Sequence, residues 1–208
     1  MALSKIQPAS MDLTDNYAFT GTNSVAGFTY EEKKLQTLTA SSSSDLSFTS
    51  GIDNTYNIYK FRFVNIHPSN NATRLKYNLS VDGGSNYNVA KQTISFQAYH
   101  NESDSGTGIV YETGTDLALG TGSQFLGGDL SNANDGCMSG ELYLFDPSST
   151  TFIKNLIASC YSMTNGDYAT FHATGTGYGN TTSAVNAVQF TMSAGTIDSG
   201  TIEMYGIN

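Results

Sequence analysis

The sequence predicts an all-β fold, an antiparallel β-sandwich of jelly-roll-like arrangement with an extended N-terminal arm. Composition is the first observation: aromatic residues make up 12% of the 208 residues, charged residues only 13%, and there are 21 Gly. This balance favours many short strands over helices. Several segments also alternate apolar and polar residues, and no helical crossover for a parallel sheet separates them. We therefore expect little helix and roughly eight to ten antiparallel strands.

The first 27 residues differ from the rest of the chain. Their short apolar pairs are broken by Pro8 and Gly21, so this stretch cannot bury much surface by itself. We expect residues 1–27 to be an arm that packs against another chain, and residues 28–208 to form the sandwich. The apolar residues expected to make the assembly contacts are Ile6, Leu13, Tyr17 and Phe19. The alternative interpretation is a free chain terminus.

The stretch from 28 to 50 leads into the sandwich through two short apolar runs, residues 34–39 and 46–48. The serine run 41–44 between them is too short to link domains and is predicted to be a loop. The pair Lys33-Lys34 directly follows two glutamates, which is typical of a solvated turn or a short helical segment.

The clearest strand is predicted at residues 57–66. Tyr59, Phe61 and Phe63 alternate with a second set of residues that includes Lys60 and Arg62, so one face of this strand is aromatic and the other can meet water. Similar runs predict strands at 73–81 and 89–99. Between these two, the Asp82-Gly-Gly sequence can adopt the positive φ angles of a tight return.

Residues 100–137 are predicted to be the longest loop-rich region. Eight glycines interrupt its short apolar runs, and long loops on a rigid sandwich commonly carry contacts with partners. We expect outward contacts from Tyr111, Asp116, Gln124 and Asp129.

Five later strands complete the predicted sandwich. Their ranges are 141–145, 154–161, 168–173, 187–192 and 200–206. The sequence Gly175-Thr-Gly-Tyr-Gly179 is expected to be a turn, because it lacks the lysine and helix of a phosphate-binding loop. The last strand alternates strongly and should be paired within the sandwich.

Charge and targeting signals exclude several classes of protein. A formal net charge of −9 disfavours nucleic acid as a partner, because that contact depends on clustered Lys and Arg. No apolar run has the length of a signal peptide or a membrane span, so we expect synthesis in the cytoplasm and no membrane insertion. Cys137 and Cys160 are then expected to be free thiols.

No catalytic residue, cofactor or metal ion is predicted. No serine lies in a nucleophile-elbow motif, and His67, His100 and His172 are expected to be ordinary strand or loop residues. Acids that could cleave a glycan as a pair are scattered along the chain. These acids are Asp45, Asp53, Glu102, Asp104, Glu112, Asp116 and Asp129. Oxygen ligands at 82–86 and 129–135 lack the spacing of a calcium loop.

Three segments resemble virion structural proteins of tailed bacteriophages. They are the aromatic strand at 57–66 with the later Asp82–Tyr87 turn, the Tyr17–Thr22 pattern of fibre-like stalks, and the Gly200–Ile207 ending. The resemblance implies a non-enzymatic bacteriophage virion protein on the particle surface. It also implies a jelly-roll-like domain and a homotrimer, because fibre-like stalks commonly wind as trimers.

Two roles within the particle stay open. A capsid decoration (cement or head-fibre) protein would bind the major capsid protein, and this is the role we expect. A short tail fibre or adhesin would instead join tail components and bind a host-surface glycan. Outside phage particles, the alternative is a carbohydrate-binding module.

Overall fold

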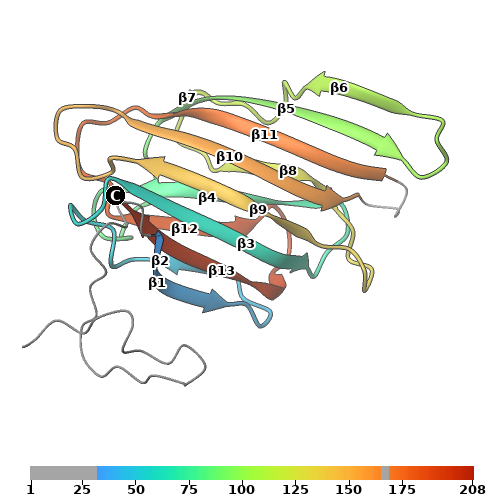
Figure 1. The fold of residues 1–208 in the computed structure, drawn as a ribbon, viewed down its shortest axis with the longest axis horizontal. Helices are drawn as coiled ribbons and strands as arrows, with labels where there is room; N and C mark the ends of the chain where they lie inside the picture. The colour runs from blue at the N-terminus through green and yellow to red at the C-terminus, as the bar shows by residue number, and fades with distance from the viewer. Residues whose placement is uncertain (1–31, 165–168) are drawn as a thin grey trace, which may run out of the picture.

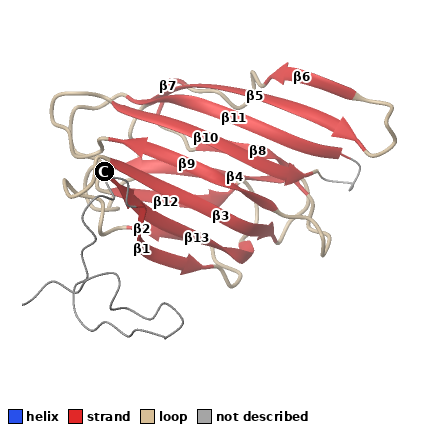
Figure 2. Ribbon diagram, in the orientation of Figure 1, coloured by secondary structure: helices blue, strands red, loops and turns tan. Residues whose placement is uncertain are grey.

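The computed structural model of the protein describes residues 32–164 and 169–208. Within these ranges the chain forms thirteen strands and no helix (Figures 1 and 2). The all-β prediction is confirmed, although the expected eight to ten strands was too low. It follows that these ranges contain no helix able to cross a membrane. The predicted arm residues Ile6, Leu13, Tyr17 and Phe19 lie outside the described residues.

The thirteen strands form two antiparallel sheets. Nine strands pair in the order β1-β13-β3-β9-β10-β11-β5-β6, with β7 also on β5, and four pair in the order β2-β12-β4-β8. Their bounds are β1 Glu32–Thr39, β2 Asp45–Phe48, β3 Ile58–Pro68, β4 Thr73–Ser80, β5 Lys91–Asn101, β6 Thr107–Tyr111, β7 Ala118–Gly120, β8 Gln124–Leu130, β9 Met138–Phe145, β10 Lys154–Met163, β11 Ala169–Gly179, β12 Ala187–Met192 and β13 Ile197–Ile207.

Eight of these strands have the strand order of a jelly roll. The order β1-β13-β3-β9 faces β2-β12-β4-β8, and the chain alternates between these two sets except at the β4 to β8 connection. Two interlocked Greek keys produce this order. The other five strands, β5, β6, β7, β10 and β11, extend the first set beyond β9, and we call them the extension (Figure 1).

Aromatic side chains hold the two sheets together. The ring of Phe190 on β12 lies 5.4 Å from that of Phe61 and 5.3 Å from that of Phe63, both on β3. Phe48 on β2 contacts the same group, 5.3 Å from Phe61. All four side chains are buried, as predicted for the aromatic face of β3. Aromatic pairs in such tilted and edge arrangements add to the free energy of area burial.

The C-terminal strand is paired on both sides. β13 lies between β1 and β3, which confirms that the alternating end of the chain belongs to the sandwich.

The pairing of β13 with β1 also gives Lys33 and Lys34 a strand conformation. The prediction of a turn or helical segment there was wrong because cross-strand hydrogen bonds override the local polar pattern.

The connection after β4 is a turn, as predicted, but it joins two sheets. Gly83 and Gly84 have φ angles of 71° and 90°, which residues other than Gly rarely adopt. Asp82 accepts hydrogen bonds from Ser80 and from the backbone and side chain of Asn86. These bonds lower the pKa of Asp82 to about 2, with the Asn86 side chain as the largest cause.

The Gly175–Gly179 segment is the end of β11, so the predicted turn was wrong. A Cβ atom added at Gly177 would collide with the carbonyl oxygen of Gln92 and lie 2.8 Å from Cα of Thr93 on the neighbouring β5. Glycine is therefore needed here for a close approach between paired strands, not for a change of chain direction.

Three strands, β6, β7 and β8, occupy the region 100–137 that was expected to be loop-rich. On β5 beside them, Thr93 and Gln97 are buried while Ile94 and Phe96 are exposed. The hydroxyl of Thr93 donates to Gln124, and the Gln124 amide donates to the carbonyl oxygen of Thr115. The inner face of β5 is thus polar, whereas that of the neighbouring β10 is apolar, with Leu156, Ala158 and Cys160 in the hydrophobic core.

The Nζ atoms of two buried lysines donate hydrogen bonds to neutral oxygen atoms. Nζ of Lys91 donates to Oδ1 of Asn78 at 2.5 Å and to the carbonyl oxygen of Val89 at 2.8 Å. Nζ of Lys154 donates to two backbone carbonyls, those of Ser149 and Phe152. Burial lowers the pKa of Lys154, and it lowers the pKa of Lys91 to about 8.

The two cysteines are free thiols, as expected, and burial raises the pKa of Cys160 to about 12.

Lys91 predicts a specific dependence of stability on pH. Between about pH 8 and pH 10.5 the unfolded lysine holds a proton that the folded one lacks, so this residue makes the protein more stable as pH rises. We expect the free energy of unfolding of the native chain, relative to Lys91→Met, to increase by roughly 1–3 kcal/mol from pH 7 to pH 10. Urea unfolding at the two pH values measures this difference.

The control for this measurement is Lys33→Met, because the Lys33 side chain is exposed on β1. Comparing each variant with the native chain at the same pH cancels the titration of other groups. An equal difference at pH 7 and pH 10 for Lys91→Met would contradict the prediction.

Candidate functional site

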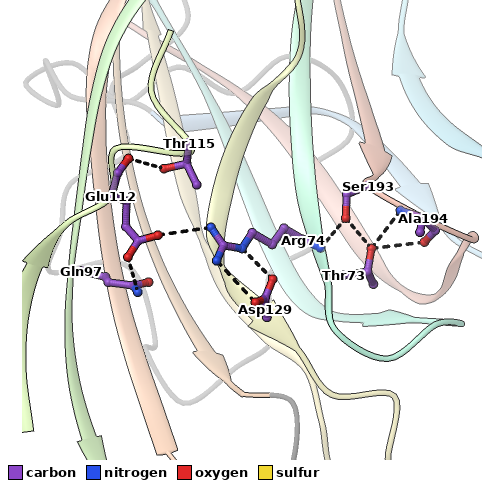
Figure 3. Close-up of polar contacts among 8 residues, drawn as sticks. All are labelled: Thr73, Arg74, Gln97, Glu112, Thr115, Asp129, Ser193 and Ala194. Carbon is purple, nitrogen blue, oxygen red and sulfur yellow. Dashed lines mark hydrogen bonds and ion pairs between the residues drawn. The ribbon is translucent and has the colours of Figure 1, made fainter.

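A polar pocket lies where the extension meets the four-stranded sheet (Figure 3). It encloses about 380 Å³ and we call it the Arg74 pocket. Its lining residues are Arg74, Glu112, Gly114, Thr115, Phe125, Asp129 and Ser193. β4 and β8 supply Arg74, Phe125 and Asp129, while Glu112 directly follows β6. The pocket therefore depends on the extension folding against the jelly roll.

Arg74 is the centre of this pocket. Its Nε lies 2.7 Å from Oδ1 of Asp129, and its Nη1 lies 3.4 Å from Oε2 of Glu112. The guanidinium carbon lies 6.0 Å from the centre of the Phe125 ring. Burial disfavours the charge on Arg74, but the two carboxylates outweigh this, so the pKa of Arg74 is raised above its ordinary value. Both acids and the aromatic ring thus hold one charged, fixed guanidinium.

Backbone and hydroxyl contacts position the surrounding residues. The amide of Gln97 on β5 donates to Oε1 of Glu112 at 2.8 Å, and the Thr115 hydroxyl donates to the Glu112 carbonyl oxygen. On the other side, the Arg74 backbone amide donates to Oγ of Ser193. Figure 3 shows these groups arranged in one row from Glu112 to Ser193. The side chains are held by two sheets and are therefore well ordered for binding.

The chemistry of the Arg74 pocket suits a polyhydroxylated ligand. Carboxylates, an amide and hydroxyls offer both donors and acceptors, and Phe125 offers an apolar surface. Glu112 and Asp129 both pair with the guanidinium of Arg74, which holds the two acidic side chains in fixed positions at the pocket.

The four residues predicted to make outward contacts differ in their exposure and position. Asp129 lines the Arg74 pocket, and Tyr111 is exposed with its hydroxyl donating to Asp116 at 2.7 Å. Whether these three make outward contacts stays a prediction. Gln124 is buried, so its prediction as an outward contact was wrong. Its amide donates to the carbonyl oxygen of Thr115 beneath β5.

Sequence reasoning missed Arg74 as a site residue and placed Glu112 only among scattered acids. The two are 38 positions apart in the chain, and no motif links them. The local sequence gave no signal, because Arg74 belongs to the polar set of the alternating run 73–81, together with Lys76 and Asn78.

The three histidines lie at separate places. His67 bonds the carbonyl oxygen of Ala133, and His100 lies 3.0 Å from Asp104. Nε2 of His172 on β11 lies 2.9 Å from Oγ of Ser159 on β10, and its ring stacks on Tyr161. A serine and a histidine in contact could form part of a nucleophilic pair. Both side chains are partly exposed on the face of the sheet that is turned away from the four-stranded sheet.

In the described part of the chain, no group of three or more His, Cys, Asp or Glu side chains could hold a metal ion. The candidate oxygen ligands at 82–86 bond one another within the turn after β4.

A second candidate surface lies at the far edge of the extension. β6 is the last strand of the large sheet, at the opposite side from β1 (Figure 1). Its sequence, Thr107-Gly-Ile-Val-Tyr111, contains no charge and no proline, and Ile109 is 79% exposed. The other edge carries Glu32, Lys33 and Lys34, which protect a sheet edge from pairing. Charged side chains therefore protect the β1 edge of the sheet, whereas the β6 strand itself carries none.

Comparisons with known proteins give no match: no family model, no curated protein and no solved structure is similar to this chain.

Proposed function

We propose that this chain is a non-enzymatic structural protein of a bacteriophage virion, displayed on the particle surface. In this proposal it is a homotrimeric capsid decoration protein, of the cement or head-fibre kind, bound to the major capsid protein. The bacteriophage assignment and the trimer rest on the resemblance of three sequence segments. The jelly-roll strand order agrees with the domain type which that resemblance implies.

The observation that carries an assembly role is the unprotected β6 edge. An exposed, uncharged edge strand offers unpaired backbone donors and acceptors to another chain. Ile109, Val110 and Tyr111 are all exposed there, although a protein that stays monomeric normally shields such a strand with charges or proline. Contact with another subunit would bury this edge.

The protein would act by adding stability to an assembly. Subunits that bury apolar side chains against one another are stabilised by mass action, so stability rises with the degree of oligomerisation. The low charge and hydroxyl-rich composition of the remaining surface would limit nonspecific adhesion.

The β6 edge predicts the behaviour of the purified full-length chain. We expect a trimer by light scattering coupled to size-exclusion chromatography. Ile109→Asp should weaken self-association at least tenfold, because a carboxylate would be buried in the contact. The matched control is Thr150→Asp, which adds the same charge in an exposed loop. A native chain that stays monomeric, or an Ile109→Asp variant that associates normally, would contradict the role of this edge.

Cryo-electron microscopy of the intact particle tests the location. We expect repeated trimers over the head lattice, in contact with capsid subunits. Density on the tail would instead make the chain a short tail fibre or adaptor that joins tail components. Absence from the particle would overturn the virion proposal.

A second candidate function is glycan binding, either as an adhesin for a host-surface glycan or as a carbohydrate-binding module. The Arg74 pocket favours it, since fixed charged side chains beside Phe125 could bond sugar hydroxyls and cover a sugar face.

Glycan-array binding by the labelled full-length chain tests this second function. Asp129→Asn removes a carboxylate of the pocket, and we expect it to weaken binding to any recognised glycan about tenfold, the loss of one charge-assisted hydrogen bond. Asp135→Asn makes the same chemical change at an exposed position nearby and serves as the control. Equal binding by the two variants, or no binding by the native chain, would exclude glycan recognition in this pocket.

A further inference from the structure

An apolar hollow lies on the outer face of the nine-stranded sheet, the face turned away from the four-stranded sheet. It encloses about 420 Å³, and we call it the end hollow. Its lining residues are Glu32, Ile58, Tyr143, Phe145, Ile157 and Ile207. Strand register explains the cluster: Ile58 pairs with both Ile207 and Phe145, and Tyr143 pairs with Ile157.

The end hollow is suited to apolar and aromatic side chains. The rings of Tyr143 and Phe145 stack 6.3 Å apart at an angle of 22°, and Ile157 is 47% exposed. Glu32, the single charged residue of the lining, forms an ion pair with Lys60. An occupant therefore gains apolar contacts and meets no unpaired charge from this lining.

The described part of the chain begins at the rim of the end hollow. Glu32 is the first described residue, it begins β1, and it lies opposite Ile207 near the end of β13. Residues 1–31 precede Glu32 in the chain. Their sequence includes Leu13, Tyr17 and Phe19 and only four charged residues.

Residues 1–31 are longer than a segment that would only cross the end hollow of the same subunit. The hollow spans five strands, about 19 Å at the usual strand spacing, a distance that about six extended residues cover. Phe19 is 13 residues before Glu32, which allows a reach of about 43 Å. The apolar residues from Leu13 to Phe19 can therefore reach another subunit.

We propose that the end hollow is the docking site for residues 1–31 of a neighbouring copy of this chain. This inference rests on the proposed assembly function and names the surface that receives the arm. Leu13, Tyr17 and Phe19 enter the hollow of the next subunit, and each subunit both donates a segment and receives one. Such an exchange links subunits through a contact separate from the β6 edge.

Site-specific photo-crosslinking in the full-length chain tests the docking. The photoreactive residue p-benzoylphenylalanine replaces Ile157 in a chain labelled with ¹⁵N, which is unfolded and refolded with an excess of unlabelled native chain. We expect crosslinks from position 157 to peptides within residues 1–31 that carry ¹⁴N. The control places the same residue at Tyr161, which is exposed on the same face of β10 four residues further along. Crosslinks to residues 1–31 should be at least fivefold rarer there.

The outcomes separate this inference from the proposed function, because light scattering on the same samples reports the oligomeric state. Crosslinks between ¹⁵N and ¹⁴N peptides in an assembled sample support the exchange. Crosslinks only within ¹⁵N chains overturn it, since the segment then covers its own hollow. An assembled sample without crosslinks to residues 1–31 overturns the docking site but leaves the assembly proposal intact. A monomeric sample overturns both.

Discussion

The contact of Phe190 with Phe61 and Phe63 is the constraint on which the rest of this structure depends. β3 and β12 lie in different sheets, and their aromatic side chains form the centre of the contact between those sheets. Because each ring must face inward, the register of both strands is set, and a shift by one residue would expose all of them. Neighbouring strands then pair with β3 and β12, and their register follows from that of these two strands.

This constraint acts on the jelly roll more than on the extension. Beyond β9 the large sheet continues past the aromatic centre, and the inner face of β5 is covered by polar groups, with Thr93 bonded to Gln124 and Gln124 bonded to Thr115. A hydrogen-bonded core of this kind is specific in geometry but contributes less burial energy than an apolar one. It also turns Ile94 and Phe96 outward, which leaves apolar side chains on the surface.

The extension thus explains where the candidate functional surfaces lie. The Arg74 pocket forms at its junction with β8, and the β6 edge is its last strand. The end hollow lies at the other side of the large sheet, next to the beginning of β1. A jelly roll alone would lack the first two surfaces. The two proposed contacts between subunits, one at each side of the sheet, are compatible with a closed assembly.

The sequence by itself determined the fold class and the strongest strands. Alternation at 57–66 and at the C-terminal end identified β3 and β13, because a period of two with aromatic residues on one face is a local property. Glycines at 83 and 84 identified the turn after β4 for the same reason. β6 and β7 could not be found this way, since most of their side chains are exposed. In β8 the buried face contains Gln124 and Gly128 as well as Leu126 and Leu130, which interrupts the apolar pattern.

Only the tertiary structure decided which residues share a site. Arg74 and Glu112 are far apart in the chain and meet because β4 and the end of β6 lie in sheets that pack together. In the same way, the Gly175–Gly179 segment is a strand because β5 approaches it closely, whereas its composition alone indicates a turn. Local patterns record which face of a strand is apolar, but contacts between distant segments decide which face is buried and which charges are paired.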